Sequence, residues 1–134
     1  MRNSPSKYFD LHTTGIGYLN RVRQVKSQEG DPFWTISLAA LRGSVDKAQY
    51  THFECRVSGK DAQEIVRRLQ APVDRELKVL INFTLSDLNP EIFTYKQGDR
   101  AGTSGVSIKA RLLRITWAKV DGQLFYSEES KRAA

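Results

Sequence analysis

The chain has 134 residues, 40% of them hydrophobic, and its 21 Lys and Arg residues against 15 Asp and Glu give a formal net charge of +6. This length suits one domain with a single core, and no apolar run approaches the roughly 18 residues of a membrane-spanning helix. The lone cysteine, Cys55, excludes an internal disulfide and a multi-cysteine zinc site. The excess of cations favours a polyanionic partner, nucleic acid first among them, with an acidic substrate or a membrane surface as alternatives.

Two strands are predicted in the N-terminal third of the chain. Residues 1–10 are expected to form a flexible arm, and because they lack the apolar run of a secretory signal they predict a cytoplasmic protein. A first strand is predicted over residues 15–26, where Gly15 and Gly17 indicate a bend or bulge. A second strand is predicted over residues 33–41. Its inward positions alternate as Trp34, Ile36, Leu38 and Ala40.

A third strand and the only helix follow. Residues 50–57 alternate, with an inward set and an outward set: Phe53, Cys55 and Val57 against Tyr50, His52, Glu54 and Arg56. A helix is predicted over residues 58–69 from apolar residues at i, i+3, i+4 and i+7: Ala62, Ile65, Val66 and Leu69. Ser58 and Asp61 have the spacing of a capping box, and Pro72 is expected to stop the helix.

Extended segments dominate the C-terminal half. A fourth strand is predicted over residues 78–86, a break at 87–90, and a resumed extended segment at 92–96. A glycine-rich loop is expected over residues 97–105. The inward positions of the fourth strand are Val79, Ile81, Phe83 and Leu85.

The fifth strand is predicted over residues 106–120, with a short extra strand at 123–126 after the Asp121-Gly122 hairpin signal, and a polar tail at 127–134. A bulge near Leu112 is expected in the fifth strand, because its inward set changes parity. That set runs from Ile108, Ala110 and Leu112 to Leu113, Ile115 and Trp117.

Three strands, one helix and two strands are the element order of the OB-fold, a five-stranded, partly open Greek-key barrel. The predicted class is therefore mainly β, with the single helix between strands three and four and the barrel over residues 11–126. Such barrels commonly bind oligonucleotides or oligosaccharides. The element order thus narrows function as well as fold.

No catalytic or metal signature is found, so the sequence predicts neither an enzyme nor a cofactor. His52 and Cys55 lie three residues apart on one strand and so face opposite sides. His12 and His52 lack partners at metal-ligand spacing. Asp87 and Glu91 flank a predicted turn, and only their spacing would suggest a pair of catalytic carboxylates.

Nucleic-acid binding is better supported than catalysis, because proteins hold single-stranded DNA or RNA in a basic groove with aromatic side chains on which the bases stack. Tyr50, Phe93 and Tyr95 are predicted to stack, and Trp34 either stacks or packs at the end of the barrel. The candidate nucleic-acid contacts are Arg21, Arg23, Trp34, Tyr50, His52, Arg56, Phe93, Tyr95, Lys96, Arg100, Lys109 and Arg111. Each charged residue in this set could instead be an ordinary solvated residue of the surface. Phe93 and Tyr95 could instead pack as a cap on the end of the barrel.

Several segments resemble bacterial single-stranded-DNA-binding proteins. The matching runs are Gly17-Tyr18-Leu19, Ile36-Ser37-Leu38-Ala39, residues 53–62, and Lys78-Val79-Leu80-Ile81 with the loop that follows. Over residues 8–126 the chain more closely resembles replication proteins of bacterial integrative and conjugative elements. That second resemblance rests on FDLHTTGIGYLNRVR at 9–23, AALRGS at 39–44 and RLLRITWAKVDG at 111–122.

The resemblance implies an OB-fold that acts on single-stranded DNA, with RNA as an alternative ligand, during replication or transfer of a mobile element. Element-encoded replication proteins and a homo-oligomer are the further partners it suggests. The third strand has Tyr50 and His52 where the bacterial single-stranded-DNA-binding proteins have tryptophan. The acidic tip of the tail of those proteins is missing from this sequence. The alternative function is an OB-fold protein–protein adaptor in a replication or conjugation complex.

Overall fold

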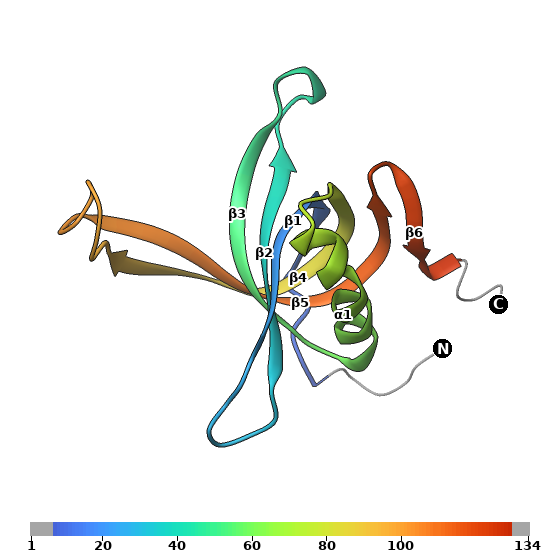
Figure 1. The fold of residues 1–134 in the computed structure, drawn as a ribbon, viewed down its shortest axis with the longest axis horizontal. Helices are drawn as coiled ribbons and strands as arrows, with labels where there is room; N and C mark the ends of the chain where they lie inside the picture. The colour runs from blue at the N-terminus through green and yellow to red at the C-terminus, as the bar shows by residue number, and fades with distance from the viewer. Residues whose placement is uncertain (1–6, 130–134) are drawn as a thin grey trace.

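The computed structural model describes residues 7–129, so the first six residues of the predicted N-terminal segment 1–10 and the last five residues of the predicted tail lie outside it. Within residues 7–129, one helix and six strands follow one another (Figure 1). Their bounds are β1 His12–Val25, β2 Phe33–Arg42, β3 Gln49–Val57, α1 Lys60–Asp74, β4 Val79–Thr94, β5 Ser104–Val120 and β6 Gln123–Ser127, with a single 3-10 turn at Val45–Lys47. No helix in this described part is long and apolar enough to cross a membrane.

The strands form one sheet that closes into a barrel. Their order is β3-β2-β1-β4-β5-β6, and β3 also pairs with β5. The β3–β5 pairing is parallel, whereas every other pairing in the sheet is antiparallel. Closure between β3 and β5, with α1 between β3 and β4 in the chain, is the OB-fold. The predicted fold class is therefore confirmed.

The barrel core is built from alternate residues of each strand, as the apolar periodicity predicts. Val79, Ile81, Phe83 and Leu85 of β4 are each at most 2% exposed, and Ile36, Leu38, Phe53 and Cys55 lie in the same cluster. The predicted apolar stripe of α1 joins them, with Val66 and Leu69 completely buried. At about 25 cal/mol per Å² of apolar surface removed from water, this burial is the main stabilising contribution to the fold.

The ends of α1 differ from the prediction. Gly59 occupies the N-cap with φ +92° and no side chain caps the helix, so the predicted Ser58–Asp61 capping box does not form. Pro72 lies inside the last turn instead of stopping the helix, because the buried Pro72 and Val73 extend its apolar face.

The C-terminus of α1 is closed by two backbone hydrogen bonds around a left-handed residue. Glu76 has φ +62°, its N–H donates to the Val73 carbonyl at 2.9 Å, and the Leu77 N–H donates to the Pro72 carbonyl at 3.1 Å. This is the Schellman arrangement, in which the left-handed position usually belongs to glycine. A glutamate therefore occupies a backbone position that costs an ordinary residue about 1 kcal/mol.

The glycines of β1 serve close packing, and its bulge lies further along the strand. The register with β2 shifts between Leu19 and Arg21. A Cβ on Gly17 would lie 2.6 Å from the Ala39 carbonyl oxygen, so only glycine lets these two backbones approach so closely. The bend in β1 was thus predicted correctly, but its position was not.

Strand β4 continues through the predicted break at residues 87–90. The register with β5 shifts between Ser86 and Asn89, and Asp87 has φ +55°. A bulge accommodates the turn-forming residues without ending the strand. Beyond this bulge, β4 and β5 leave the barrel as a two-stranded arm (Figure 1).

Strand β5 has the expected bulge and a second one that was not foreseen. Its register with β4 skips Leu113 and then Thr116. The second skip turns Ala118 inward, 0% exposed, and leaves Trp117 half-buried with the Lys119 ammonium 5.3 Å from its ring. Leu113 and Trp117 are therefore not core residues, contrary to the predicted inward set. The β5–β6 hairpin is confirmed, with positive φ at both Asp121 and Gly122.

Candidate nucleic-acid interface

The outward residues of β1, β2, β3 and β5 lie side by side in register. One row across the strands is Arg21, Ser37, Glu54 and Lys109, and the next is Arg23, Thr35, Arg56 and Arg111. Because side chains alternate along a strand, these positions share the side of the sheet opposite the core. We call this surface the outer face. It gathers five cations from three strands: Arg21, Arg23, Arg56, Lys109 and Arg111.

An aromatic cluster lies at one end of the outer face. The ring centroids of Tyr18 and Tyr50 are 6.4 Å apart, as are those of Tyr50 and His52. Ala39 pairs with Tyr18 on one side and His52 on the other, and it is only 5% exposed although it points outward. This small residue lets side chains of β1 and β3 meet across β2. Tyr50 itself remains 46% exposed, so its ring is open to a stacking partner.

The other end of the outer face is cationic. The Arg56 guanidinium lies 4.1 Å from the centroid of the Phe33 ring, which holds it in place by a cation–π contact. Arg111 pairs with Asp87 at 3.3 Å, and this exposed pair contributes little to stability. The carboxylate of Glu54 accepts a hydrogen bond from the Ser37 hydroxyl at 2.9 Å. Arg56 is thus held against the Phe33 ring, and Arg111 shares an exposed ion pair from which a phosphate could displace Asp87.

The arm continues the same surface away from the barrel. Lys109 of the outer face pairs with Asn89, and alternation from there places Glu91, Phe93, Ser107 and Gly105 on the same side of the arm. The Phe93 and Tyr95 rings meet edge to face at 4.9 Å. A Cβ on Gly105 would lie 2.7 Å from the Phe93 ring, so the glycine makes room for that ring.

The tip of the arm is arranged around Tyr95. The Arg100 guanidinium lies 5.4 Å from the Tyr95 ring centroid and donates a hydrogen bond to the Tyr95 hydroxyl at 3.1 Å. Backbone hydrogen bonds from the Tyr95 N–H to Thr103 and from the Gly102 N–H to the Tyr95 carbonyl close the tip. The glycine-rich loop predicted over residues 97–105 is thus a compact turn that joins Tyr95 to Arg100, and β5 begins within the predicted range at Ser104.

The opposite side of the arm is apolar and continues the inner side of the barrel. Ile92 pairs with Val106 and Pro90 with Ile108, and Ile108 packs against the core. Ile92 is 79% exposed and Val106 is 66% exposed. The arm therefore has one face with rings and cations and another with exposed aliphatic side chains.

The structure brings most of the predicted contacts onto one continuous surface of the outer face and arm. Trp34 is the exception, because it lies on the inner side of β2 and packs against the core. Lys96 is exposed just after the arm strand. Tyr18 and Phe33 are the aromatic residues that sequence reasoning missed. The alternation of β2 already indicated that Phe33 points outward. The contact of Tyr18 with Tyr50, by contrast, depends on the register of three strands.

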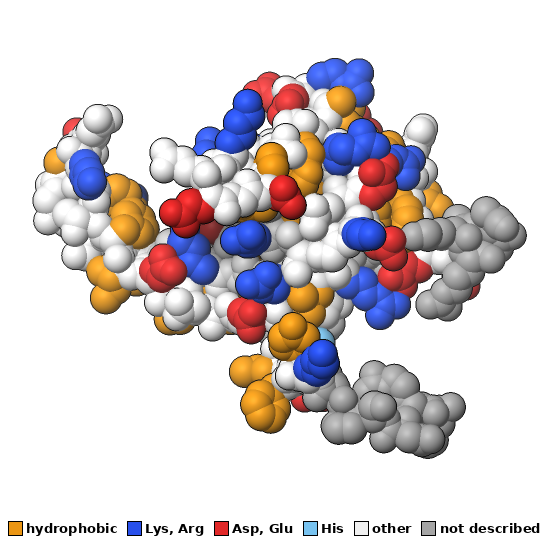
Figure 2. All heavy atoms as spheres, turned by 90° about the horizontal axis from the view of Figure 1, so that it is seen from below, with side chains coloured by type: hydrophobic (Ala, Val, Ile, Leu, Met, Phe, Trp, Pro, Cys, Tyr) orange, Lys and Arg blue, Asp and Glu red, His pale blue; other side chains and the backbone are white. Residues whose placement is uncertain are grey.

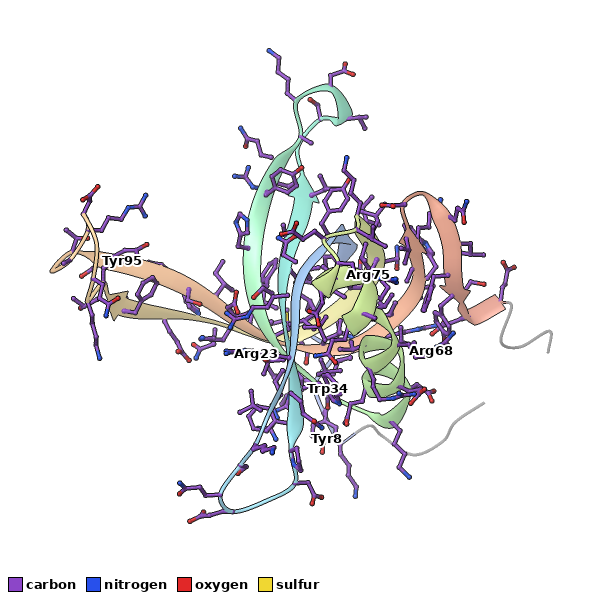
Figure 3. All side chains as sticks on the ribbon, viewed as in Figure 1. Tyr8, Arg23, Trp34, Arg68, Arg75 and Tyr95 are labelled. Carbon is purple, nitrogen blue, oxygen red and sulfur yellow. The ribbon has the colours of Figure 1, made fainter. Side chains whose placement is uncertain are left out.

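Figures 2 and 3 show how charged and apolar side chains are spread over the molecule. In Figure 2 Lys and Arg side chains are interspersed with Asp and Glu over the middle of the molecule, and hydrophobic side chains lie on the arm at the left. In Figure 3 Tyr95 lies on the arm and Arg23 on the barrel, whereas Arg68 lies on α1 and Arg75 directly follows that helix, on the other side of the barrel from the arm.

The described part of the chain offers little for catalysis. Residues 7–129 contain no group of three His, Cys, Asp or Glu side chains that could hold a metal ion. Cys55 is 2% exposed, and burial, with a smaller contribution from the charge of Glu54, raises the pKa of its thiol to about 12. Its thiol therefore stays protonated at neutral pH and is no nucleophile.

Comparisons with known proteins give a family and a likeness to solved structures. A family profile described as "Protein of unknown function (DUF3577)" matches residues 2–134. No curated protein matches the sequence. A solved structure of a Plasmodium falciparum SSB complex with ssDNA is similar with a TM-score of 0.43 and 14% sequence identity, over 92% of this chain and 100% of that chain. The family description states no function, so a function has to come from the residues of the chain itself.

Proposed function

We propose that this chain, which belongs to the DUF3577 family, is a non-catalytic protein that binds single-stranded DNA along the outer face and the arm. The observation that supports this most is the continuity of the two surfaces through Lys109, which puts stacking rings and cations on one path. Exposed rings favour a single strand over a duplex, because only unpaired bases can turn onto them.

The proposed division of roles follows the positions of the side chains. Tyr50, Tyr18 and His52 stack bases on the barrel, and Phe93 and Tyr95 stack bases on the arm. The five outer-face cations, Arg21, Arg23, Arg56, Lys109 and Arg111, bind the phosphates between these platforms, with Lys96 and Arg100 at the arm tip. Stacking and phosphate contacts are both indifferent to base identity, so most of the binding energy is independent of sequence.

The test is a titration of fluorescent oligo-dT at several salt concentrations, with duplex DNA of equal length as competitor. We expect binding that duplex does not displace and that weakens with salt. Seven phosphate contacts, five on the outer face and two at the arm tip, correspond to a slope of about −4.9 in log affinity against log salt, at about −0.7 per phosphate. An affinity that salt does not change, or equal competition by duplex, contradicts the proposal.

Charge variants locate the path. Replacing Arg23 or Arg56 with Ala should lower oligo-dT affinity and make the salt slope shallower by about 0.7 each. Arg68→Ala removes an equal charge from α1, beside Phe125, and is the matched control that should leave binding unchanged. Asp87→Asn should strengthen binding, because it frees Arg111 from its ion pair. If Arg68→Ala weakens binding as much as Arg56→Ala, net charge and not the outer face is responsible.

We place this activity in the replication or transfer of a bacterial mobile element, in the cytoplasm, together with replication proteins that the element encodes. The support is the resemblance of residues 9–23, 39–44 and 111–122 to replication proteins of such elements. RNA is the alternative ligand, because the same rings and cations suit it. Competition between oligo-dT and oligo-U of equal length decides between them.

A second candidate function, a protein–protein adaptor, is favoured by the aliphatic side of the arm. Ile92 and Val106 are paired neighbours, both well exposed, and isolated two-stranded hairpins are marginal in water without something to pack against. Cross-linking to the replication proteins of the element, with and without Ile92→Asp, tests this function. Capture that Ile92→Asp abolishes, together with an absence of oligo-dT binding, would favour the adaptor.

A further inference from the structure

A depression of about 460 Å³ lies beside the aromatic cluster of the outer face. Its lining combines Tyr18 and Tyr50 of the aromatic cluster with residues at the end of α1 and just after it. It is lined by Tyr18, Leu19, Asn20, Tyr50, Val73, Glu76, Leu77, Lys78 and Val79. It therefore adjoins the platform proposed to stack bases, because Tyr50 belongs to both.

The depression has a rigid frame. The Lys78 N–H donates to the Asp121 carboxylate at 3.0 Å, and the Asp121 N–H donates to the Lys78 carbonyl at 2.8 Å, which fixes the start of β4 to the β5–β6 turn. Leu19, Val73 and Val79 are core residues with at most 8% exposure, so this part of the lining is apolar and fixed. A planar base that entered the depression would find both apolar residues and tyrosines in its lining.

Glu76 is the unusual member of this lining. It occupies the left-handed position of the Schellman arrangement, where glycine would relieve the strain. A residue kept in an unfavourable conformation beside a cavity points to a role for its side chain. Its carboxylate only accepts hydrogen bonds, so the ligand that it suits carries donors.

The geometry points to a nucleobase pocket that selects guanine, an inference that rests on the proposed binding of single-stranded DNA. Guanine has two adjacent N–H donors on its Watson–Crick edge, N1–H and the N2 amino group, which match the two oxygens of one carboxylate. Thymine offers one donor between two carbonyl oxygens that the carboxylate would repel. Lys78, on the lining, supplies a cation for the phosphate of the same nucleotide. The bound DNA strand is thus held without regard to its sequence along the outer face and arm, and one of its bases is recognised specifically in the pocket.

The test compares three fluorescent strands: oligo-dT, oligo-dT with one central dG, and oligo-dT with one central deoxyinosine, which lacks the N2 amino group. We expect the dG strand to bind about tenfold more tightly than oligo-dT, within the range of one bidentate base contact. The deoxyinosine strand should lose most of that gain. Glu76→Gln should abolish the preference while leaving oligo-dT affinity equal or slightly raised.

Two further variants separate the carboxylate from charge and folding. Asp74→Asn removes one negative charge nearby on α1 from a residue outside the lining, and the preference for dG should survive it. Glu76→Gly removes the carboxylate and the backbone strain together. It should abolish the preference while raising the melting temperature, which shows that the loss does not come from unfolding.

The outcomes distinguish the two proposals. Tight binding of oligo-dT with no gain from dG overturns the guanine pocket and leaves single-strand binding intact. A preference for dG that persists in Glu76→Gln, or a deoxyinosine strand that binds as tightly as the dG strand, also overturns it. Failure of every strand to bind removes both proposals together.

Discussion

The two halves of the β4–β5 strand pair have the same backbone pairing and opposite surroundings. In the barrel half, Phe83 is 2% exposed and Leu85 is completely buried. In the arm half, beyond the bulge at Asp87, Phe93 is 39% exposed and Ile92 is 79% exposed. Both halves alternate and both form antiparallel ladders. Whether a third strand lies alongside decides whether their apolar side chains are buried.

The difference separates stability from binding. In the barrel half β4 has β1 on its other side and β5 reaches β3, whereas the β4 ladder with β1 ends at Ser86 and the β5 ladder with β3 begins at Ile108. Side chains in the arm therefore contribute little to the core and are available to a ligand. Substitutions in the barrel half should act on unfolding, and those in the arm half on binding.

The largest expected contrast is between two phenylalanines on one strand. Phe83→Ala should lower the free energy of unfolding by about 3–5 kcal/mol, because it leaves a cavity in the core. Phe93→Ala should lower it by no more than about 1 kcal/mol, because the ring is exposed and meets mainly Tyr95. Urea denaturation followed by circular dichroism measures both. Similar losses for the two variants would mean that the arm is part of the cooperative core.

Two glycines provide the next contrast. Gly17→Ala would put a Cβ 2.6 Å from the Ala39 carbonyl oxygen, and we expect it to destabilise the fold by about 1–3 kcal/mol through overpacking. Gly105→Ala would put a Cβ 2.7 Å from the Phe93 ring and 3.0 Å from the Tyr95 ring, and both exposed rings can move, so its cost should stay below about 0.5 kcal/mol. Gly105→Ala should nevertheless weaken oligo-dT binding, because it displaces Phe93. Unchanged binding would show that Phe93 takes no part.

Binding should distinguish the two sides of the arm. Phe93→Ala should weaken oligo-dT binding by about tenfold, within the 1–3 kcal/mol typical of one stacked base. Ile92→Ala is the matched control, since Ile92 is the adjacent residue on the aliphatic side and should not alter affinity. Fluorescence anisotropy at fixed salt measures both. A larger effect from Ile92→Ala would indicate that the strand lies on the opposite side.

The smallest contrast concerns the buried thiol of the barrel. Because burial raises the pKa of Cys55 to about 12, the thiol ionises first in the unfolded chain. The stability that the neutral thiol provides is complete below the unfolded pKa of about 8.5 and is lost as pH rises toward 12. From pH 8 to 9.5 the wild type should lose about 1 kcal/mol more than Cys55→Ala. Parallel pH profiles of the two unfolding free energies would mean that Cys55 is accessible to water.

Much of the site could be predicted from the sequence, because alternation along a strand determines on which side of the sheet each side chain lies. Alternation alone put Arg21, Arg23 and Arg56 outward, and Phe83 and Cys55 inward. It failed where the register changes, as at Trp117, because a bulge is recorded in the pairing of two strands and not in either strand alone. Tyr18 was missed for a related reason, since its neighbour Tyr50 is 32 positions away in the chain.

The sequence by itself determined the order of elements, the faces of the strands and the excess of positive charge, because each follows from neighbouring residues or from composition. Only the tertiary structure decided where β4 and β5 leave the barrel and which outward residues meet across β2. It also placed Glu76 in a left-handed turn beside the two tyrosines. These features depend on long-range strand pairing and on the packing of α1 against the barrel, and no local pattern specifies them.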